Sequence, residues 1–376
     1  MVVKIHSLRG LPLVGGIAVG LAAAAAAEPP ASTLRRTQLL EYRDSSGEIQ
    51  KVVSAAGWGK RRSEIVTATE SIMGAFPDAA ARVDLAIKVE EEIDVGSYVR
   101  RLITFHSEPG SRTPAYLCIP KAVLGKGRHR AAPAVLCLHP TDHQVGHQVV
   151  VGLAGRTGRQ YASELAERGY VTVAPAYPLM ANYHPELEQL GYRSGTMKAI
   201  WDNSRCLDLL SSFDFVDSSK GFGAIGHSLG GHNAIFTTVF DRRISVIVTS
   251  CGFDSFLDYY GGDEERWLPG KGWCQGRYMP RLAGYRGRLG EIPFDFHELL
   301  GAIAPRKVFV SAPRRDSNFR WRSARSCVDS AQRVYELLGA DGQLQAVYPD
   351  CDHHFPTEIR AQAYAAIAAI LKPDSK

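Results

Sequence analysis

A serine enclosed by glycines, at the junction of a strand and a helix, is the feature that most constrains this chain. Residues 221–232 read GFGAIGHSLGGH. Small and apolar residues precede Ser228, as in a buried strand, and apolar residues recur at helical spacing from Ala234 to Phe240. The pattern predicts a sharp strand-to-helix turn that exposes the Ser228 hydroxyl, the arrangement called a nucleophile elbow.

Short apolar strands alternate with helices along most of the chain. This alternation predicts an α/β fold with a doubly wound, mostly parallel sheet and helices on both faces. In such folds the functional site lies at the carboxyl ends of the strands. We expect strands at 98–105, 115–119, 134–138, 171–174, 244–250, 308–310 and 344–348, and helices at 160–168, 197–210, 322–338 and 357–371.

The amino-terminal residues have a different composition from the remainder. Lys4 and Arg9 precede an alanine-rich apolar run that ends in three alanines, which is the pattern of a secretory signal peptide. A retained membrane anchor is the alternative, but the run is short and interrupted by glycines, so no stable membrane span is expected after cleavage. We therefore expect a secreted or periplasmic protein. The expected parts are a signal peptide at 1–27, a helical extension at 28–95 and a catalytic domain at 96–376.

Charge and cysteine content exclude some classes of function. The net charge is +5 without a long basic run or an aromatic-basic repeat, so a nucleic-acid partner is not expected. The seven cysteines include no CxxC, and an oxidising compartment would permit one or two disulfides of unreadable connectivity. His139, His143 and His147 are spaced by four, but Gly146 argues against the helix that would make them metal ligands. We expect exposed loop histidines there, no metal site and no cofactor.

A serine nucleophile needs a base that is itself oriented by an acid. In the elbow architecture these partners follow in the order serine, acid, histidine. Asp316 lies in the loop after the strand at 307–310, and His353 in the loop after the strand at 344–348. Asp254 is an alternative acid and His354 an alternative base. We expect Ser228, Asp316 and His353 to form a catalytic triad.

An oxyanion hole requires backbone N–H groups that point at the developing negative charge. Leu229 follows the nucleophile and supplies one such group. The second is expected from the loop after the strand at 134–138. Because Pro140 has no N–H, Thr141 is the expected second donor.

Residues 252–295 do not follow the alternation of strands and helices. They carry tyrosines and tryptophans among many glycines and charged residues. A long irregular segment in a compact domain is usually functional or mobile, so we expect a lid-like insertion over the site. A packed surface excursion is the alternative. Trp267 and Trp273 are the expected substrate-binding residues.

The chain resembles the α/β-hydrolase superfamily over nearly all of its mature length. It is similar to secreted bacterial esterases of the dienelactone-hydrolase and acetyl-xylan-esterase-like branch. The residues that carry the resemblance are Gly226–Gly231, Ser194–Asn203 and Asp350–His353. The family pattern favours the first histidine of the pair, His353. In the family this histidine usually precedes Asp-Phe-Pro, and this chain has His354 in place of that aspartate. Many relatives also have Gly or Gln directly after the histidine that ends the oxyanion strand, where this chain has Pro140.

The resemblance implies a serine carboxylic ester hydrolase that forms an acyl-enzyme intermediate and needs no cofactor. The expected substrate is a short-chain ester or an acetylated carbohydrate. A serine peptidase of the prolyl-oligopeptidase kind is an alternative, although the segment before the sheet is too short for a propeller domain. A catalytically inactive α/β-hydrolase that acts as a binding protein is the second alternative.

Overall fold

The computed structural model describes residues 38–125 and 131–373. The expected signal peptide lies outside the described residues. No helix in the described part of the chain is long and apolar enough to cross a membrane.

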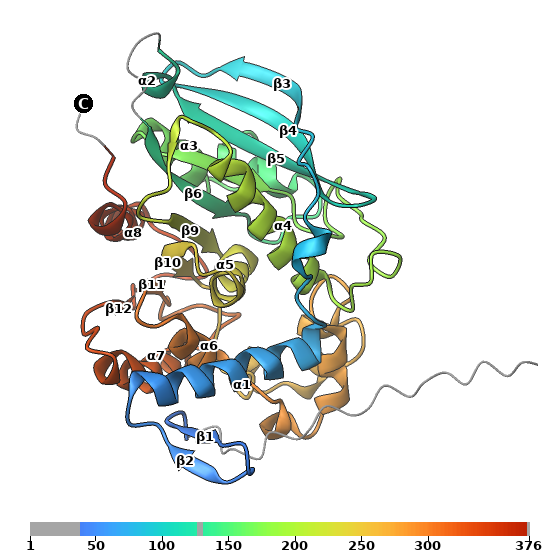
Figure 1. Cartoon of the computed structure of the whole chain (residues 1–376), viewed down its shortest axis with the longest axis vertical. Coiled ribbons are helices and arrows are strands. Elements are labelled where there is room, and N and C mark those ends of the chain that lie inside the picture. Colours follow the sequence, from blue (N-terminus) through green and yellow to red (C-terminus); the bar gives the residue numbers. More distant parts are fainter. Residues whose placement is uncertain (1–37, 126–130, 374–376) are drawn as a thin grey trace, which may run out of the picture.

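A mixed ten-stranded sheet forms the centre of the molecule (Figure 1). Its main path runs β12-β11-β10-β9-β6-β7-β5-β4-β3, and the short β8 pairs with β6. The strands from β12 to β7 are parallel to one another, whereas β5, β4 and β3 are antiparallel. The strand bounds are β3 Lys88–Asp94, β4 Tyr98–Glu108, β5 Ser111–Pro120, β6 Ala132–Leu138, β7 Val171–Pro175, β8 Val216–Asp217, β9 Phe222–His227, β10 Ile244–Ser250, β11 Lys307–Ser311 and β12 Leu344–Val347.

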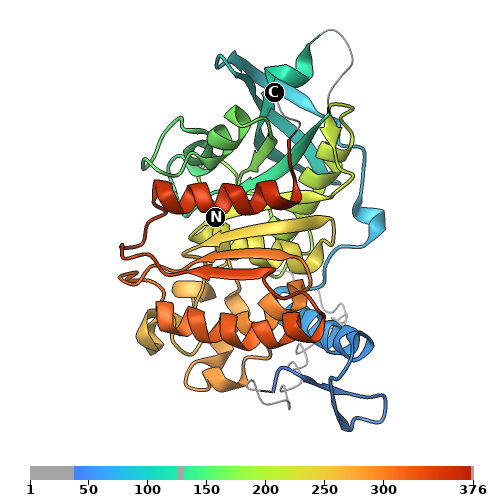
Figure 2. The ribbon, with the colours of Figure 1, turned by 90° about the vertical axis from the view of Figure 1, so that its left-hand side faces the viewer.

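Helices cover both faces of this sheet, which confirms the predicted doubly wound architecture. Side chains alternate across the strands: Val135 belongs to the core with α3 and α8, whereas Leu136 belongs to the core with α4, α5, α6 and α7. Figure 2 views the molecule from the side of α8, drawn red. The helices are α2 Lys121–Leu124, α3 Tyr161–Glu167, α4 Gly195–Ser211, α5 Leu229–Phe240, α6 Phe296–Ile303, α7 Trp321–Leu337 and α8 Thr357–Ile370.

The strand order reverses between β6 and β9. The chain leaves β6 to form β7 on one side and later returns to form β9 on the other. The loops at the carboxyl ends of these two strands therefore diverge and leave a crevice, where ligands bind in open α/β sheets. The loop after β6 and the residue after β9 are the two positions expected to supply the oxyanion donors and the nucleophile.

The amino-terminal segment is only partly helical, which corrects the predicted helical extension. It contains helix α1, but also a separate two-stranded antiparallel sheet. In addition, β3 lies before the predicted domain boundary and yet belongs to the central sheet. All residues of β3 are exposed and most are charged, so its sequence does not show the alternation of apolar and polar residues by which a strand is predicted. The bounds are β1 Glu41–Arg43, β2 Ile49–Lys51, α1 Ala55–Met73 and the 3₁₀ turn η1 Ala79–Ala81.

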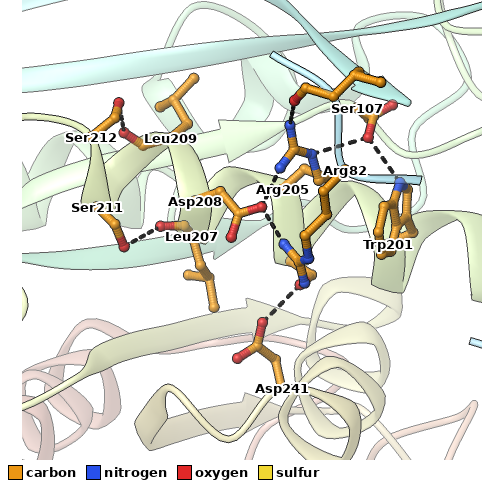
Figure 3. Close-up of polar contacts among 12 residues, drawn as sticks. Arg82, Ser107, Trp201, Arg205, Leu207, Asp208, Leu209, Ser211, Ser212 and Asp241 are labelled. Atoms are coloured by element: carbon orange, nitrogen blue, oxygen red, sulfur yellow. Dashed lines mark hydrogen bonds and ion pairs between the residues drawn. The ribbon is translucent and has the colours of Figure 1, made fainter. Parts of the chain in front are cut away.

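Polar contacts attach this segment to helix α4 (Figure 3). Arg82 forms an ion pair with Asp208, and its guanidinium also donates to the Ser204 hydroxyl at 3.1 Å. Arg205 donates to the main-chain oxygens of Val83 and Ser107. Charge-assisted hydrogen bonds of this kind fix the segment to α4.

Residues 252–295 form short 3₁₀ turns joined by loops. Most of their aromatic side chains are buried, so this segment is packed on the domain. The turns are η3 Tyr259–Gly261, η4 Glu264–Trp267, η5 Gly272–Cys274, η6 Pro280–Tyr285 and η7 Leu289–Glu291, and η2 Gly146–Val151 follows β6. All seven cysteines are free thiols.

Candidate active site

Ser228 sits at the turn between β9 and α5 in a backbone conformation that non-glycine residues rarely adopt. Its φ is 54° and its ψ is −123°. Such conformations cost of order 1–3 kcal/mol and persist where the surrounding structure holds them. The Ser228 N–H donates to the main-chain oxygen of Ser250 at 2.8 Å, which fixes the turn against β10.

Two of the glycines around Ser228 are required by close backbone contacts. A Cβ atom on Gly226 would lie 2.1 Å from the carbonyl carbon of Gly230. A Cβ atom on Gly230 would lie 1.9 Å from the carbonyl oxygen of Leu138, the last residue of β6. Helix α5 therefore begins directly against the end of β6, and the pattern of glycines reflects this approach.

His353 and Asp316 form a hydrogen-bonded pair in the adjacent loops. The Nδ1–H of His353 donates to both carboxylate oxygens of Asp316, each at 2.9 Å. The carboxylate also accepts the N–H groups of Asn318 at 2.8 Å and Phe319 at 3.2 Å. The Asp316 side chain is 1% exposed and that of His353 is 20% exposed. A buried carboxylate so held can orient the imidazole and stabilise its protonated form.

His227 lies beneath this pair and stays neutral. Its ring centroid lies 4.9 Å from that of His353, and its Nδ1 is 3.1 Å from the Ser250 hydroxyl oxygen. Burial, with added repulsion from Arg159 and His353, holds the pKa of His227 well below its usual value. A neutral His227 does not oppose a positive charge on His353.

The loop after β6 is held by His139. Its Nδ1–H donates to the main-chain oxygen of Pro140 at 2.7 Å, and its Nε2 accepts the N–H of Tyr177 at 3.0 Å. Burial lowers the pKa of His139 to about 4, so the ring is neutral. Both ring nitrogens are engaged, which leaves no lone pair for a metal ion. The sequence expectation of an exposed loop histidine is wrong for His139, because the ring is only 3% exposed.

A cavity of about 690 Å³ joins these elements. Ser228, Leu229, His353 and Thr141 all line it, so the structure brings the expected nucleophile, base and oxyanion donors to one space. Leu229 is the first residue of α5, where N–H groups have no acceptor within the helix. The Thr141 hydroxyl pairs with the Tyr278 hydroxyl at 3.2 Å.

The alternative acid and base lie elsewhere. Asp254 is 2% exposed, and its carboxylate accepts the Arg320 N–H at 2.9 Å instead of contacting His353. Burial is the main cause that raises the pKa of Asp254 to about 8. His354 is exposed and does not line the cavity. The geometry therefore favours Asp316 and His353.

The two tryptophans of the insertion have different surroundings. Trp273 lines the cavity and stacks on His232, with ring centroids 4.0 Å apart and planes at 12°. Trp267 is fully buried and packs against Phe256 and Tyr259, outside the cavity lining. The expectation that Trp267 binds substrate is corrected, because its indole is part of the core.

Cys251 lies beside the His353–Asp316 pair and could complete a set of three metal-ligand types. The donor set does not suit a metal ion, because Nδ1 of His353 already carries the proton shared with Asp316. Burial also raises the pKa of the Cys251 thiol well above its usual value, so the thiolate is disfavoured. The cluster is better described as a histidine–carboxylate pair with a neutral thiol next to it.

Several cavity residues carry no sequence motif. Arg156 and Arg159 lie before α3, and Arg266 and Tyr278 lie in the insertion. A basic pair in a loop that follows a central strand was the one available signal, and it is common on protein surfaces. Their placement at the site depends on tertiary structure.

A family model described as fungal glucuronyl esterase matches residues 189–339, a span that contains Ser228 and Asp316. No curated protein matches the sequence.

Several solved structures are similar to this chain. A glucuronoyl esterase from Solibacter usitatus has a TM-score of 0.68 at 21% identity, and the match covers 90% of this chain and 98% of that one. A glucuronoyl esterase of carbohydrate esterase family 15 from Caldicellulosiruptor kristjansonii has a TM-score of 0.64 at 19% identity, with 92% of each chain covered. Acetyl xylan esterase 1 from a Thermoanaerobacterium species has a TM-score of 0.51 at 15% identity, with 82% of this chain and 93% of that one covered. These likenesses confirm the predicted α/β-hydrolase fold.

Proposed function

We propose that this protein is a serine esterase that hydrolyses carboxylic esters of carbohydrates through an acyl-enzyme intermediate. The observation that carries the proposal is the His353–Asp316 pair, whose imidazole shares one cavity with Ser228 at its strained turn. Nucleophilic acyl transfer requires a serine that the substrate can reach and a base that a carboxylate orients. No cofactor has a part in this chemistry.

Each residue has a role in the proposed reaction. The Ser228 oxygen attacks the ester carbonyl while Nε2 of His353 takes the hydroxyl proton. The N–H groups of Leu229 and Thr141 stabilise the oxyanion. The tetrahedral intermediate then expels the alcohol, which takes the proton back from His353. Water, activated by the same imidazole, attacks the acyl-enzyme, releases the carboxylic acid and regenerates Ser228.

The carbohydrate part of the proposal has two supports. Aromatic side chains of the insertion, Tyr259, Trp273 and Tyr278, line the cavity and offer apolar faces with polar edges to a sugar ring. The matching family model and several similar structures are described as glucuronoyl esterases. In such an ester the sugar supplies the acyl group, so we favour a uronic acid ester over an acetylated sugar.

Secretion to the periplasm or beyond is part of the proposal. It is supported by the basic and apolar amino-terminal sequence. Expression of the full chain followed by amino-terminal sequencing of the extracytoplasmic fraction should give a chain that begins at Glu28. Recovery of uncleaved protein from the cytoplasm would contradict it.

A substrate panel tests the proposed activity. The purified protein should hydrolyse the benzyl ester of glucuronic acid faster than acetylated xylan, and should leave aminoacyl amides intact. Ser228→Ala should lose hydrolysis, whereas Ser326→Ala, which changes an exposed serine on α7, should keep it. Preferential cleavage of the amides would support the peptidase alternative. If the protein hydrolyses none of these substrates, the alternative of a binding protein is favoured.

A further inference from the structure

Arg159 is a buried cation in the wall of the catalytic cavity. Arg159 is only 4% exposed, yet it is one of the residues that line the cavity. Its Nη2 donates to the main-chain oxygen of His353 at 3.2 Å. Its Nη1 has no hydrogen-bond partner among the described residues. The guanidinium therefore lies next to the proposed base with part of its donor capacity unused.

No carboxylate of the described residues forms an ion pair with Arg159. The neighbouring Arg360 is neutralised by Glu164 at 3.0 Å, so that acid is already engaged. Asp142, a carboxylate in the cavity lining, accepts the N–H groups of Gln144 and Val145 in its own turn. A buried charge without a counter-ion carries a large desolvation cost. The cost would be offset by an anion that enters with the ligand.

Arg156 adds a second positive charge on the same loop. It is exposed at the cavity, and it too forms no ion pair with a described carboxylate. The proximity of Arg156 contributes to lowering the pKa of Arg159, after the larger effect of burial. A third cavity cation, Arg266, is instead held by Asp263 at 3.4 Å and by the ring of Tyr260. Arg156 and Arg159 are therefore the two cations available to a ligand.

We infer that Arg156 and Arg159 bind a free carboxylate of the substrate, so that the preferred substrate is an acidic carbohydrate with one esterified and one ionised carboxyl group. The inference rests on the proposed esterase function and adds a charge requirement to its substrate. Guanidinium groups match the planar geometry of carboxylates. The aromatic faces of Tyr259 and Trp273 in the same cavity suit the sugar rings that carry these groups.

A purely structural role for Arg159 makes a different prediction. If its contact with the His353 carbonyl only positions the base, then loss of Arg159 should reduce kcat equally for charged and neutral esters. If it binds a carboxylate, the loss should fall mainly on KM and mainly on the charged ester. The comparison of two esters therefore separates the two roles.

Binding to the Ser228→Ala variant tests the inference without turnover. Calorimetric titration should show that digalacturonate binds more tightly than its dimethyl ester. Arg159→Met and Arg156→Gln, each added to Ser228→Ala, should weaken digalacturonate binding about tenfold, in line with the loss of a charge-assisted hydrogen bond. The control Arg333→Gln removes an exposed arginine of α7 that does not line the cavity and should change nothing. Equal affinity for the acid and its dimethyl ester would overturn the inference.

Kinetics with the otherwise wild-type enzyme give an independent answer. The monomethyl ester of digalacturonate should have a higher kcat/KM than the dimethyl ester, and this ratio should fall about tenfold in Arg156→Gln. Added salt should reduce the ratio as well, because Arg156 is exposed to screening. An unchanged ratio in both arginine variants would contradict the inference while leaving the esterase function intact. Failure to hydrolyse either ester would instead count against the proposed function, and the binding titration would still decide the role of the arginines.

Discussion

The Nδ1–H of His353 points between the two carboxylate oxygens of Asp316, each at 2.9 Å from Nδ1. Nε2 is therefore the ring nitrogen that can accept a proton. This relationship predicts the effect of removing the charge of the acid. Asp316→Asn should lower kcat by a factor of about 10³ to 10⁴ with little change in KM, because the imidazole loses its orientation and its stabilised charge. Steady-state kinetics on a glucuronate benzyl ester measure both constants.

Asp254→Asn is the matched control for that variant. It makes the same chemical change in a carboxyl group that contacts Arg320 instead of His353. Most of the activity should remain. If Asp254→Asn were the more damaging of the two, the orienting acid would have to be reassigned.

The buried carboxyl of Asp254 also predicts a pH dependence of stability. Burial, with smaller contributions from Asp258, Asp295 and Asp316, raises the pKa of Asp254 to about 8, against about 3.9 in an unfolded chain. The fold therefore prefers the neutral form. Its contribution to stability is fully present below about pH 4 and is lost as pH rises towards 8.

Asparagine is neutral at every pH, so Asp254→Asn should escape this loss. The melting temperature of the variant relative to wild type should rise by several degrees between pH 5 and pH 9. Calorimetric melting of both proteins across this range checks the trend. The exposed Asp341→Asn should show no such trend. A relative melting temperature that falls with pH would contradict the raised pKa.

The two adjacent histidines predict unequal losses of activity. His353→Ala should abolish turnover, because it removes the ring that is bonded to Asp316. His354 is exposed and lies outside the cavity lining, so His354→Ala should cost less than about tenfold. Kinetics on both variants measure the order of the two losses. The reverse order would transfer the role of base to His354.

The sequence was most informative where local pattern and tertiary structure agree. The strand at 244–250 was predicted with the bounds that β10 has, because a short segment rich in β-branched residues matches a strand that is largely buried. Helix α6 was missed, since it is short and follows the irregular insertion, although Asp295 and Glu298 form a capping box at its start. The elbow was predictable because its glycines lie close together in the sequence, and close backbone contacts require Gly226 and Gly230 at this turn.

The tryptophans of the insertion predict different kinds of defect. Trp267→Ala should destabilise the fold by about 3–5 kcal/mol, because its indole is fully buried against Phe256 and Tyr259. Trp273→Ala should raise KM for a carbohydrate ester while a small aryl acetate is affected much less. Chemical denaturation and kinetics on both esters separate the two effects. Equal losses on both esters for Trp273→Ala would show that Trp273 has no binding role.

These tryptophans also show where sequence reasoning fails. Both lie in a segment rich in glycine and aromatic residues, and no periodicity distinguishes a core indole from one that lines a cavity. The same holds for Arg159, whose exposure of 4% results from packing against elements distant in sequence. Contacts of this kind depend on how the loops after different strands converge, which local spacing does not encode.

Covalent modification of Ser228 is the most direct test of the proposed catalytic mechanism. The purified protein is incubated with diisopropyl fluorophosphate, and the adduct is located by mass spectrometry of its peptides. The account predicts one phosphorylated residue, Ser228, with loss of esterase activity in proportion to labelling and no labelling of the folded Ser228→Ala protein. Labelling should also fall sharply in His353→Ala, because the imidazole activates the serine. An unlabelled wild-type protein that retains esterase activity, or an adduct on another serine with Ser228 unmodified, would contradict it.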